Sequence, residues 1–106
     1  MSTPFDISVD ELAQRRGVGL AVLDVREPWE LEICRLSDSM AIPLASLPER
    51  VGELPRSGTL VVMCHHGGRS ARAVQWLRSQ GFANAVNLAG GIDEWARRIE
   101  PAMRTY

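Results

Sequence analysis

Apolar residues along the chain follow two rhythms, short continuous runs and longer stretches with helical spacing. The runs are rich in Val, Leu and Ile and end at turn residues, which is typical of strands buried on both faces of a sheet. They predict strands at residues 20–25, 59–63 and 84–88 and a short extended piece at residues 40–44. Helical spacing and capping signals predict helices at residues 8–14, 28–34, 44–54, 70–80 and 91–99. Strands that alternate with helices favour an α/β fold with a parallel sheet.

The length and charge of the chain narrow the class of protein. A chain of 106 residues predicts one domain, residues 1–106, with residues 101–106 as a surface tail. Because 12 basic residues balance 13 acidic ones, neither nucleic acid nor a membrane surface is a predicted partner. Residues 1–10 lack the basic and apolar regions of a signal peptide, and no apolar run approaches the ~20 residues of a membrane span. We therefore expect a cytoplasmic protein.

Two cysteines, Cys34 and Cys64, raise the question of a disulfide or a metal site. A structural disulfide is disfavoured in the cytoplasm. Cys64, His65 and His66 are consecutive, and three consecutive side chains rarely converge on one tetrahedral centre. The sequence therefore predicts no metal site and no cofactor.

The run Cys64-His65-His66-Gly67-Gly68-Arg69-Ser70 stands between the strongest predicted strand and the strongest predicted helix. A loop of this kind directs free backbone N–H groups toward an anion beyond the carboxyl ends of the strands. Gly67 and Gly68 allow the positive φ values that curl such a loop into a nest, and Ser70 can cap the helix. Within the nest Cys64 is the predicted nucleophile, because a helix N-terminus and a nearby Arg lower the pKa of a cysteine.

The other side chains of this loop have supporting parts. Arg69 offers a planar set of donors that can hold a sulfonate or a similar oxyanion. His65 and His66 can add donors or partial positive charge. A second interpretation stays open, in which Cys64 is a small buried hydrophobe and the glycine pair is an ordinary turn.

Four segments together resemble the rhodanese-homology domains, and the resemblance extends from about Phe5 to Arg98. They are DVREPWE at residues 24–30, AIPL at 41–44, CHHGGRS at 64–70 and LAGGIDEW at 88–95. The resemblance implies a five-stranded, mainly parallel sheet with helices on both faces. It also implies sulfur transfer through a persulfide on Cys64, with thiosulfate and cyanide as the family's test substrates.

The resemblance carries two further implications for single residues. Asp24 and Arg26 match residues that the family places near the active-site loop, where they position it through hydrogen bonds; the alternative is a strand end and a surface ion pair. Residues 34–38 depart from the family's Gly-His-Ile-Pro-Gly pattern. Asp38 can partly replace a glycine there, whereas Cys34 is less suited. One hypothesis is that Cys34 reacts with the persulfide or resolves an oxidised Cys64.

The predicted function is a thiosulfate sulfurtransferase that uses a small-molecule sulfur donor and a thiol, cyanide or protein persulfide partner. One alternative is a noncatalytic binding or regulatory module with the same fold. Another is a cysteine-dependent phosphatase or arsenate reductase, in which five residues separate the cysteine from the arginine. Here four residues separate Cys64 from Arg69, and the smaller ring favours one added sulfur atom over a tetrahedral phosphate. The sequence does not specify the physiological donor and acceptor, the pathway or the oligomeric state.

Overall fold

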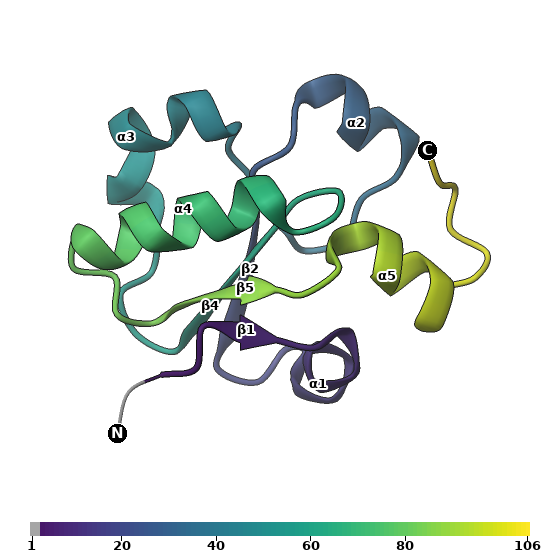
Figure 1. Ribbon diagram of the computed structural model, residues 1–106, viewed down its shortest axis with the longest axis horizontal. Helices are drawn as coiled ribbons and strands as arrows, with labels where there is room; N and C mark the ends of the chain where they lie inside the picture. The colour runs from purple at the N-terminus through teal and green to yellow at the C-terminus, as the bar shows by residue number, and fades with distance from the viewer. Residues whose placement is uncertain (1–2) are drawn as a thin grey trace.

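The computed structural model describes residues 3–106 as a five-stranded sheet flanked by helices (Figure 1). The strands are β1 (Asp6–Ile7), β2 (Leu20–Asp24), β3 (Met40–Ala41), β4 (Thr59–Met63) and β5 (Ala85–Leu88). Their order is β1-β5-β4-β2-β3, and every neighbouring pair is parallel. The predicted α/β fold and five-stranded sheet are confirmed. The first two residues of the predicted domain lie outside the described residues.

The helices form a layer on each face of the sheet. They are α1 (Val9–Arg15), α2 (Pro28–Ile33), α3 (Leu47–Arg50), α4 (Gly68–Ser79) and α5 (Gly91–Arg98), with 3₁₀ turns η1 (Leu44–Ser46) and η2 (Val51–Glu53). In Figure 1, α3 and α4 lie on one side of the strands and α1 on the other. Helix α5 packs in the same core cluster as α1. The prediction of one helix over residues 44–54 is wrong: Pro48 has no N–H to donate, and the segment divides into η1, α3 and η2.

Alternate side chains of the central strands supply the two halves of the core. Leu23, Leu60 and Val62 pack in the cluster that includes α4, whereas Val22 and Val61 pack in the cluster that includes α1 and α5. Burial on both faces explains why these strands are nearly continuous apolar runs in the sequence. None of the helices within residues 3–106 is long and apolar enough to cross a membrane.

The carboxyl ends of the parallel strands meet at one edge of the sheet. Asp24, the last residue of β2, pairs in register with Met63 at the end of β4 and with Ala41 at the end of β3. The segments that follow β2, β4 and β5 therefore emerge side by side, and they lead into α2, α4 and α5. This edge is where ligands bind in open α/β sheets.

Segment 34–38, which departs from the family's Gly-His-Ile-Pro-Gly pattern, contains one residue with the positive φ that glycine adopts most easily. Among the described residues, Asp38 is the only non-glycine with positive φ, at 65°. Aspartate tolerates this region better than most residues, so the prediction that Asp38 substitutes for glycine is confirmed. Cys34 has φ −162°, an extended conformation that needs no glycine.

Candidate active site

The loop of residues 64–70 follows β4 and enters α4. Gly67 is the N-cap of α4 and has φ 109°, a left-handed conformation that glycine adopts without steric cost. Gly68 is instead the first helical residue, so only one of the two glycines supplies the predicted positive φ. Ser70 lies inside the first turn of α4, and the prediction that it caps the helix is wrong because the chain already turns at Gly67.

The Cys64 sulfur lies inside the curl of this loop. Its Sγ accepts hydrogen bonds from the Gly67 N–H at 3.1 Å and the Ser70 N–H at 3.4 Å, and the Ser70 hydroxyl lies 3.3 Å away. Cys64 is only 1% exposed. The sulfur is thus buried, but the amides of the following residues face it, as an anion site requires.

Burial and hydrogen bonding have opposite effects on the pKa of the Cys64 thiol. Burial alone raises the pKa of Cys64, because it disfavours the charged thiolate. The Ser70 hydroxyl and the backbone N–H groups of Gly67, Arg69 and Ser70 act in the opposite direction. Together these hydrogen bonds outweigh the effect of burial, so the pKa of Cys64 lies below its ordinary value. The loop therefore stabilises the thiolate of Cys64 relative to that of an ordinary cysteine.

The hydroxyl of Ser70 carries one proton and has two neighbours. It lies 2.5 Å from Asn87 Oδ1 and 3.3 Å from Cys64 Sγ, so it donates to one of them at a time. Asn87 in turn donates from Nδ2 to Asp6 Oδ1 at 3.1 Å. A chain of polar groups thus connects the thiol to β5 and β1.

Replacing Ser70 by alanine is expected to raise the pKa of the Cys64 thiol, because one donor to the thiolate is lost. The backbone donors remain, so the rise is partial. The thiolate's ultraviolet absorbance, followed against pH in a Cys34→Ser background, measures it. Ser79→Ala is the matched control, since that hydroxyl binds a carbonyl of the same helix. An unchanged midpoint for Ser70→Ala contradicts the prediction.

Two backbone hydrogen bonds clamp the loop to the start of α5. The Ile92 N–H donates to the Cys64 carbonyl at 3.0 Å, and the Asp93 N–H donates to the His65 carbonyl at 3.1 Å. Gly91 makes this approach possible: it has φ 63°, and a Cβ there would collide with both carbonyls. The LAGGIDEW segment therefore holds the loop in place through its backbone.

Arg69 projects toward α2 and forms a two-pronged ion pair with Glu30. Arg69 Nη1 donates to Glu30 Oε2 at 2.7 Å and Nη2 donates to Oε1 at 2.8 Å. Hydrogen bonds from Arg69 outweigh the opposing effect of burial and, with those from Tyr106 and the Glu27 backbone, lower the pKa of Glu30 to about 2. The guanidinium predicted to bind an anionic donor is thus occupied by a carboxylate of the protein.

Asp24 and Arg26 form a buried pair behind α2, and both side chains are 0% exposed. Arg26 Nη2 donates to Asp24 Oδ2 at 2.8 Å and to the Cys34 carbonyl, also at 2.8 Å. Arg26 Nη1 reaches the Glu30 carbonyl at 3.3 Å. The alternative of a surface ion pair is therefore wrong, because Arg26 is fully buried just after the end of β2. These bonds fix α2 and residue 34.

Comparison with known proteins shows the family of the chain. The sequence pattern of the Rhodanese-like domain matches residues 8–98. The chain belongs to the rhodanese-like domain family. A protein named "Sulfurtransferase" from Allochromatium vinosum is 33% identical over 98 residues, which cover 91% of this chain and 92% of that protein.

Other relatives match this chain over nearly their whole length or over only part of it. The crystal structure of a rhodanese-related protein from Thermoplasma volcanium is similar with a TM-score of 0.84 and 38% identity, covering 92% of this chain and 96% of that one. The "Probable adenylyltransferase/sulfurtransferase MoeZ" of Mycobacterium tuberculosis is 39% identical over 92 residues. That match covers 85% of this chain and only 24% of MoeZ.

Three residues of this rhodanese-like site, namely Glu30, Asn87 and Tyr106, were not predicted from the sequence. Asn87 left a signal, since it is a polar residue in the otherwise apolar strand β5. Glu30 lies three residues after Glu27 and accepts from its N–H at 2.9 Å, a capping arrangement that hides its second role with Arg69. Nothing in the sequence indicated a role for Tyr106, because the residues before it show no hydrophobic periodicity that predicts a helix or a strand.

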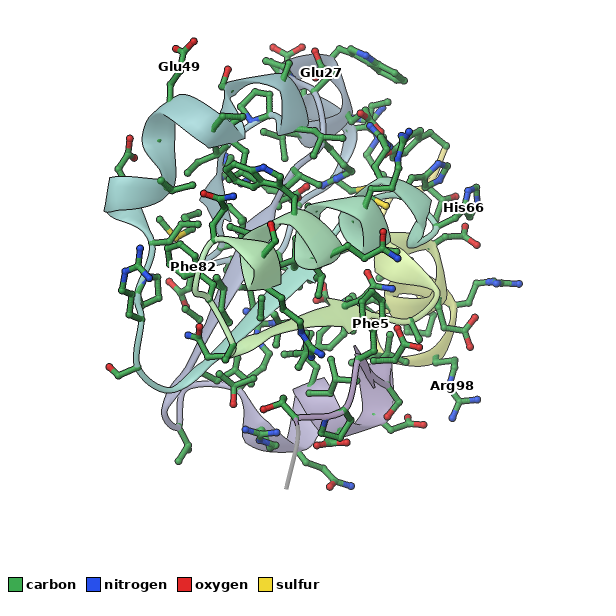
Figure 2. All side chains as sticks on the ribbon, turned by 60° about the vertical axis from the view of Figure 1, so that its left-hand side comes forward. Phe5, Glu27, Glu49, His66, Phe82 and Arg98 are labelled. Atoms are coloured by element: carbon green, nitrogen blue, oxygen red, sulfur yellow. The ribbon has the colours of Figure 1, made fainter. Side chains whose placement is uncertain are left out.

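The two histidines lie on the outer side of the loop. Their rings stack with centroids 3.9 Å apart, and His66 is exposed at the periphery of the molecule in Figure 2. Burial, together with the electrostatic effect of His66, lowers the pKa of His65, so the neutral form of His65 is favoured. His65, His66 and Asp93 bring one ligand atom each within 4.8 Å of one another and are the described residues that could hold a metal ion.

Proposed function

We propose that this protein is a sulfurtransferase in which Cys64 carries a sulfane sulfur as a persulfide. The observation that carries the proposal is the Cys64 sulfur itself, which accepts from the Gly67 and Ser70 N–H groups at the carboxyl edge of the sheet. These donors stabilise the thiolate nucleophile, and their position allows them to stabilise a persulfide anion that is one sulfur atom longer.

In the first half-reaction the Cys64 thiolate attacks the outer sulfur of thiosulfate. An S–S bond forms at Cys64, the S–S bond of thiosulfate breaks, and its electron pair leaves with sulfite. The charges balance, since the Cys64 thiolate and the thiosulfate dianion give the persulfide anion and the sulfite dianion. Arg69 is the guanidinium in this loop that can hold the sulfonate group, once Glu30 yields it.

In the second half-reaction a nucleophile removes the outer sulfur. Cyanide gives thiocyanate, and a thiolate gives a new persulfide; in both cases the S–S bond at Cys64 breaks and its electron pair returns to the Cys64 thiolate. Cyanide, a small thiol or a protein thiol that becomes a protein persulfide approaches the same short loop. The relatives named as sulfurtransferases support this reaction class.

Mass spectrometry of the intact protein after incubation with thiosulfate tests the proposal. We expect a gain of one sulfur atom per chain, which added cyanide removes as thiocyanate. Cys34→Ser should give the same gain, because Cys34 is not bound by the loop amides. No gain and no thiocyanate would favour the noncatalytic module, and turnover of an aryl phosphate or arsenate would favour the phosphatase class.

A further inference from the structure

The C-terminal residues of the chain lie against the candidate active site. After α5 the chain turns back and ends beside α2, as Figure 1 shows. Along this path residues 104–106 and His65 line one crevice with Cys34 and with Ile92, Asp93 and Ala96 of α5. The segment therefore spans the distance between the active-site loop and α2.

Tyr106 makes the contacts that hold this segment. Its ring stacks on His65 with centroids 3.9 Å apart and an interplanar angle of 12°, and it forms a T-shaped pair with Trp29 with centroids 5.7 Å apart. Its hydroxyl donates to Glu30 Oε1 at 2.6 Å and accepts from Arg26 Nη1 at 3.0 Å. Burial and the bond to Glu30 raise the pKa of Tyr106 to about 12, so the hydroxyl keeps its proton at neutral pH.

The Tyr106 hydroxyl acts on the same carboxylate that occupies Arg69. Glu30 Oε1 accepts both from Tyr106 and from Arg69 Nη2, and the Glu30 side chain is only 3% exposed. The hydrogen bond from the protonated Tyr106 hydroxyl stabilises the Glu30 carboxylate in its position beside Arg69. An anionic donor competes with Glu30 for Arg69, so every bond that holds Glu30 weakens donor binding.

We infer that Tyr106 is a specificity-determining residue of this site: it holds Glu30 on Arg69 and covers the His65 side of the loop, so dianionic sulfur donors bind only after it is displaced. The inference rests on the proposed sulfur transfer. Arg69 is still 32% exposed, which leaves its outer side open to an approaching anion. A donor without a sulfonate group does not need Arg69 and is less affected by the hydroxyl.

Steady-state kinetics with thiosulfate and saturating cyanide test the inference. For Tyr106→Ala the KM for thiosulfate is expected to fall about tenfold with kcat nearly unchanged, since a hydrogen bond to a charged group has been removed from the competing state. Tyr106→Phe keeps the stacked ring and loses the hydroxyl, so its KM should be intermediate. Ala102→Ser, a change at an exposed residue of the same segment, is the matched control.

A binding measurement without turnover separates the two proposals. Tyr106 is the only tyrosine, so fluorotyrosine gives a single fluorine resonance, and in Cys64→Ser protein it should shift and saturate with thiosulfate. An unchanged or raised KM in Tyr106→Ala, or a resonance that ignores thiosulfate while native protein forms the persulfide, overturns the role of Tyr106. Absence of persulfide in native protein and every Tyr106 variant overturns the proposed function instead.

Discussion

Cys64→Ser is expected to abolish both persulfide formation and thiocyanate production, with a loss on the order of 10³-fold or more, as for removal of a covalent nucleophile. The serine hydroxyl sits among the same donors, the N–H groups of Gly67 and Ser70, but it is far less acidic than a thiol and remains protonated. Intact-mass measurement and thiocyanate release quantify the loss.

Two comparisons separate this loss from unfolding. Serine is close to cysteine in size, so the denaturation curve of Cys64→Ser should stay near that of the native protein. Cys34→Ser removes the other free cysteine, whose Sγ lies 4.0 Å from Arg26 Nη1, and should retain persulfide formation. A gain of sulfur by Cys64→Ser equal to that of the native protein would assign the chemistry to Cys34.

The position of the loop was predictable because its signals are local. The run at residues 59–63 has the composition of a buried strand, and α4 follows it with helical spacing. The glycine at the junction is read directly from the sequence, although only the structure shows that Gly67 has the positive φ and Gly68 opens the helix. Strand order and the two-residue strand β1 leave no such pattern, since they depend on pairing between distant segments.

The partners of the loop could not be predicted for the same reason. Glu30 and Arg69 are 39 positions apart, and Tyr106 and Glu30 are 76 apart. The first pair forms because the ends of β2 and β4 emerge at one edge of the sheet, and the second because the chain turns back toward α2 after α5. No periodicity in the sequence encodes either pair. Composition alone presents Arg69 as a free cation, whereas the fold pairs it with a carboxylate.

Burial of Arg26 also could not be read from residue type, because arginine is rarely fully buried unless it is paired. Here Asp24 supplies a counter-charge two residues earlier, and the carbonyls of Glu30 and Cys34 and the Tyr106 hydroxyl accept from the other guanidinium N–H groups. Among the described residues no buried side-chain nitrogen or oxygen lacks a partner. The ion pair is therefore part of the core and fixes α2, which carries Glu30 to Arg69.

Arg26→Met is expected to lower the free energy of unfolding by about 3–5 kcal/mol, because it leaves the Asp24 carboxylate buried without its counter-charge. Denaturation by urea measures the change. Arg50→Met is the matched control: its ion pair with Glu53 has the same 2.8 Å separation but is exposed, so no measurable loss is expected. The double variant Asp24→Asn with Arg26→Met should recover part of the stability, since the unpaired charge is removed with its partner. Equal effects of Arg26→Met and Arg50→Met would show that burial of the Asp24 pair contributes nothing to stability.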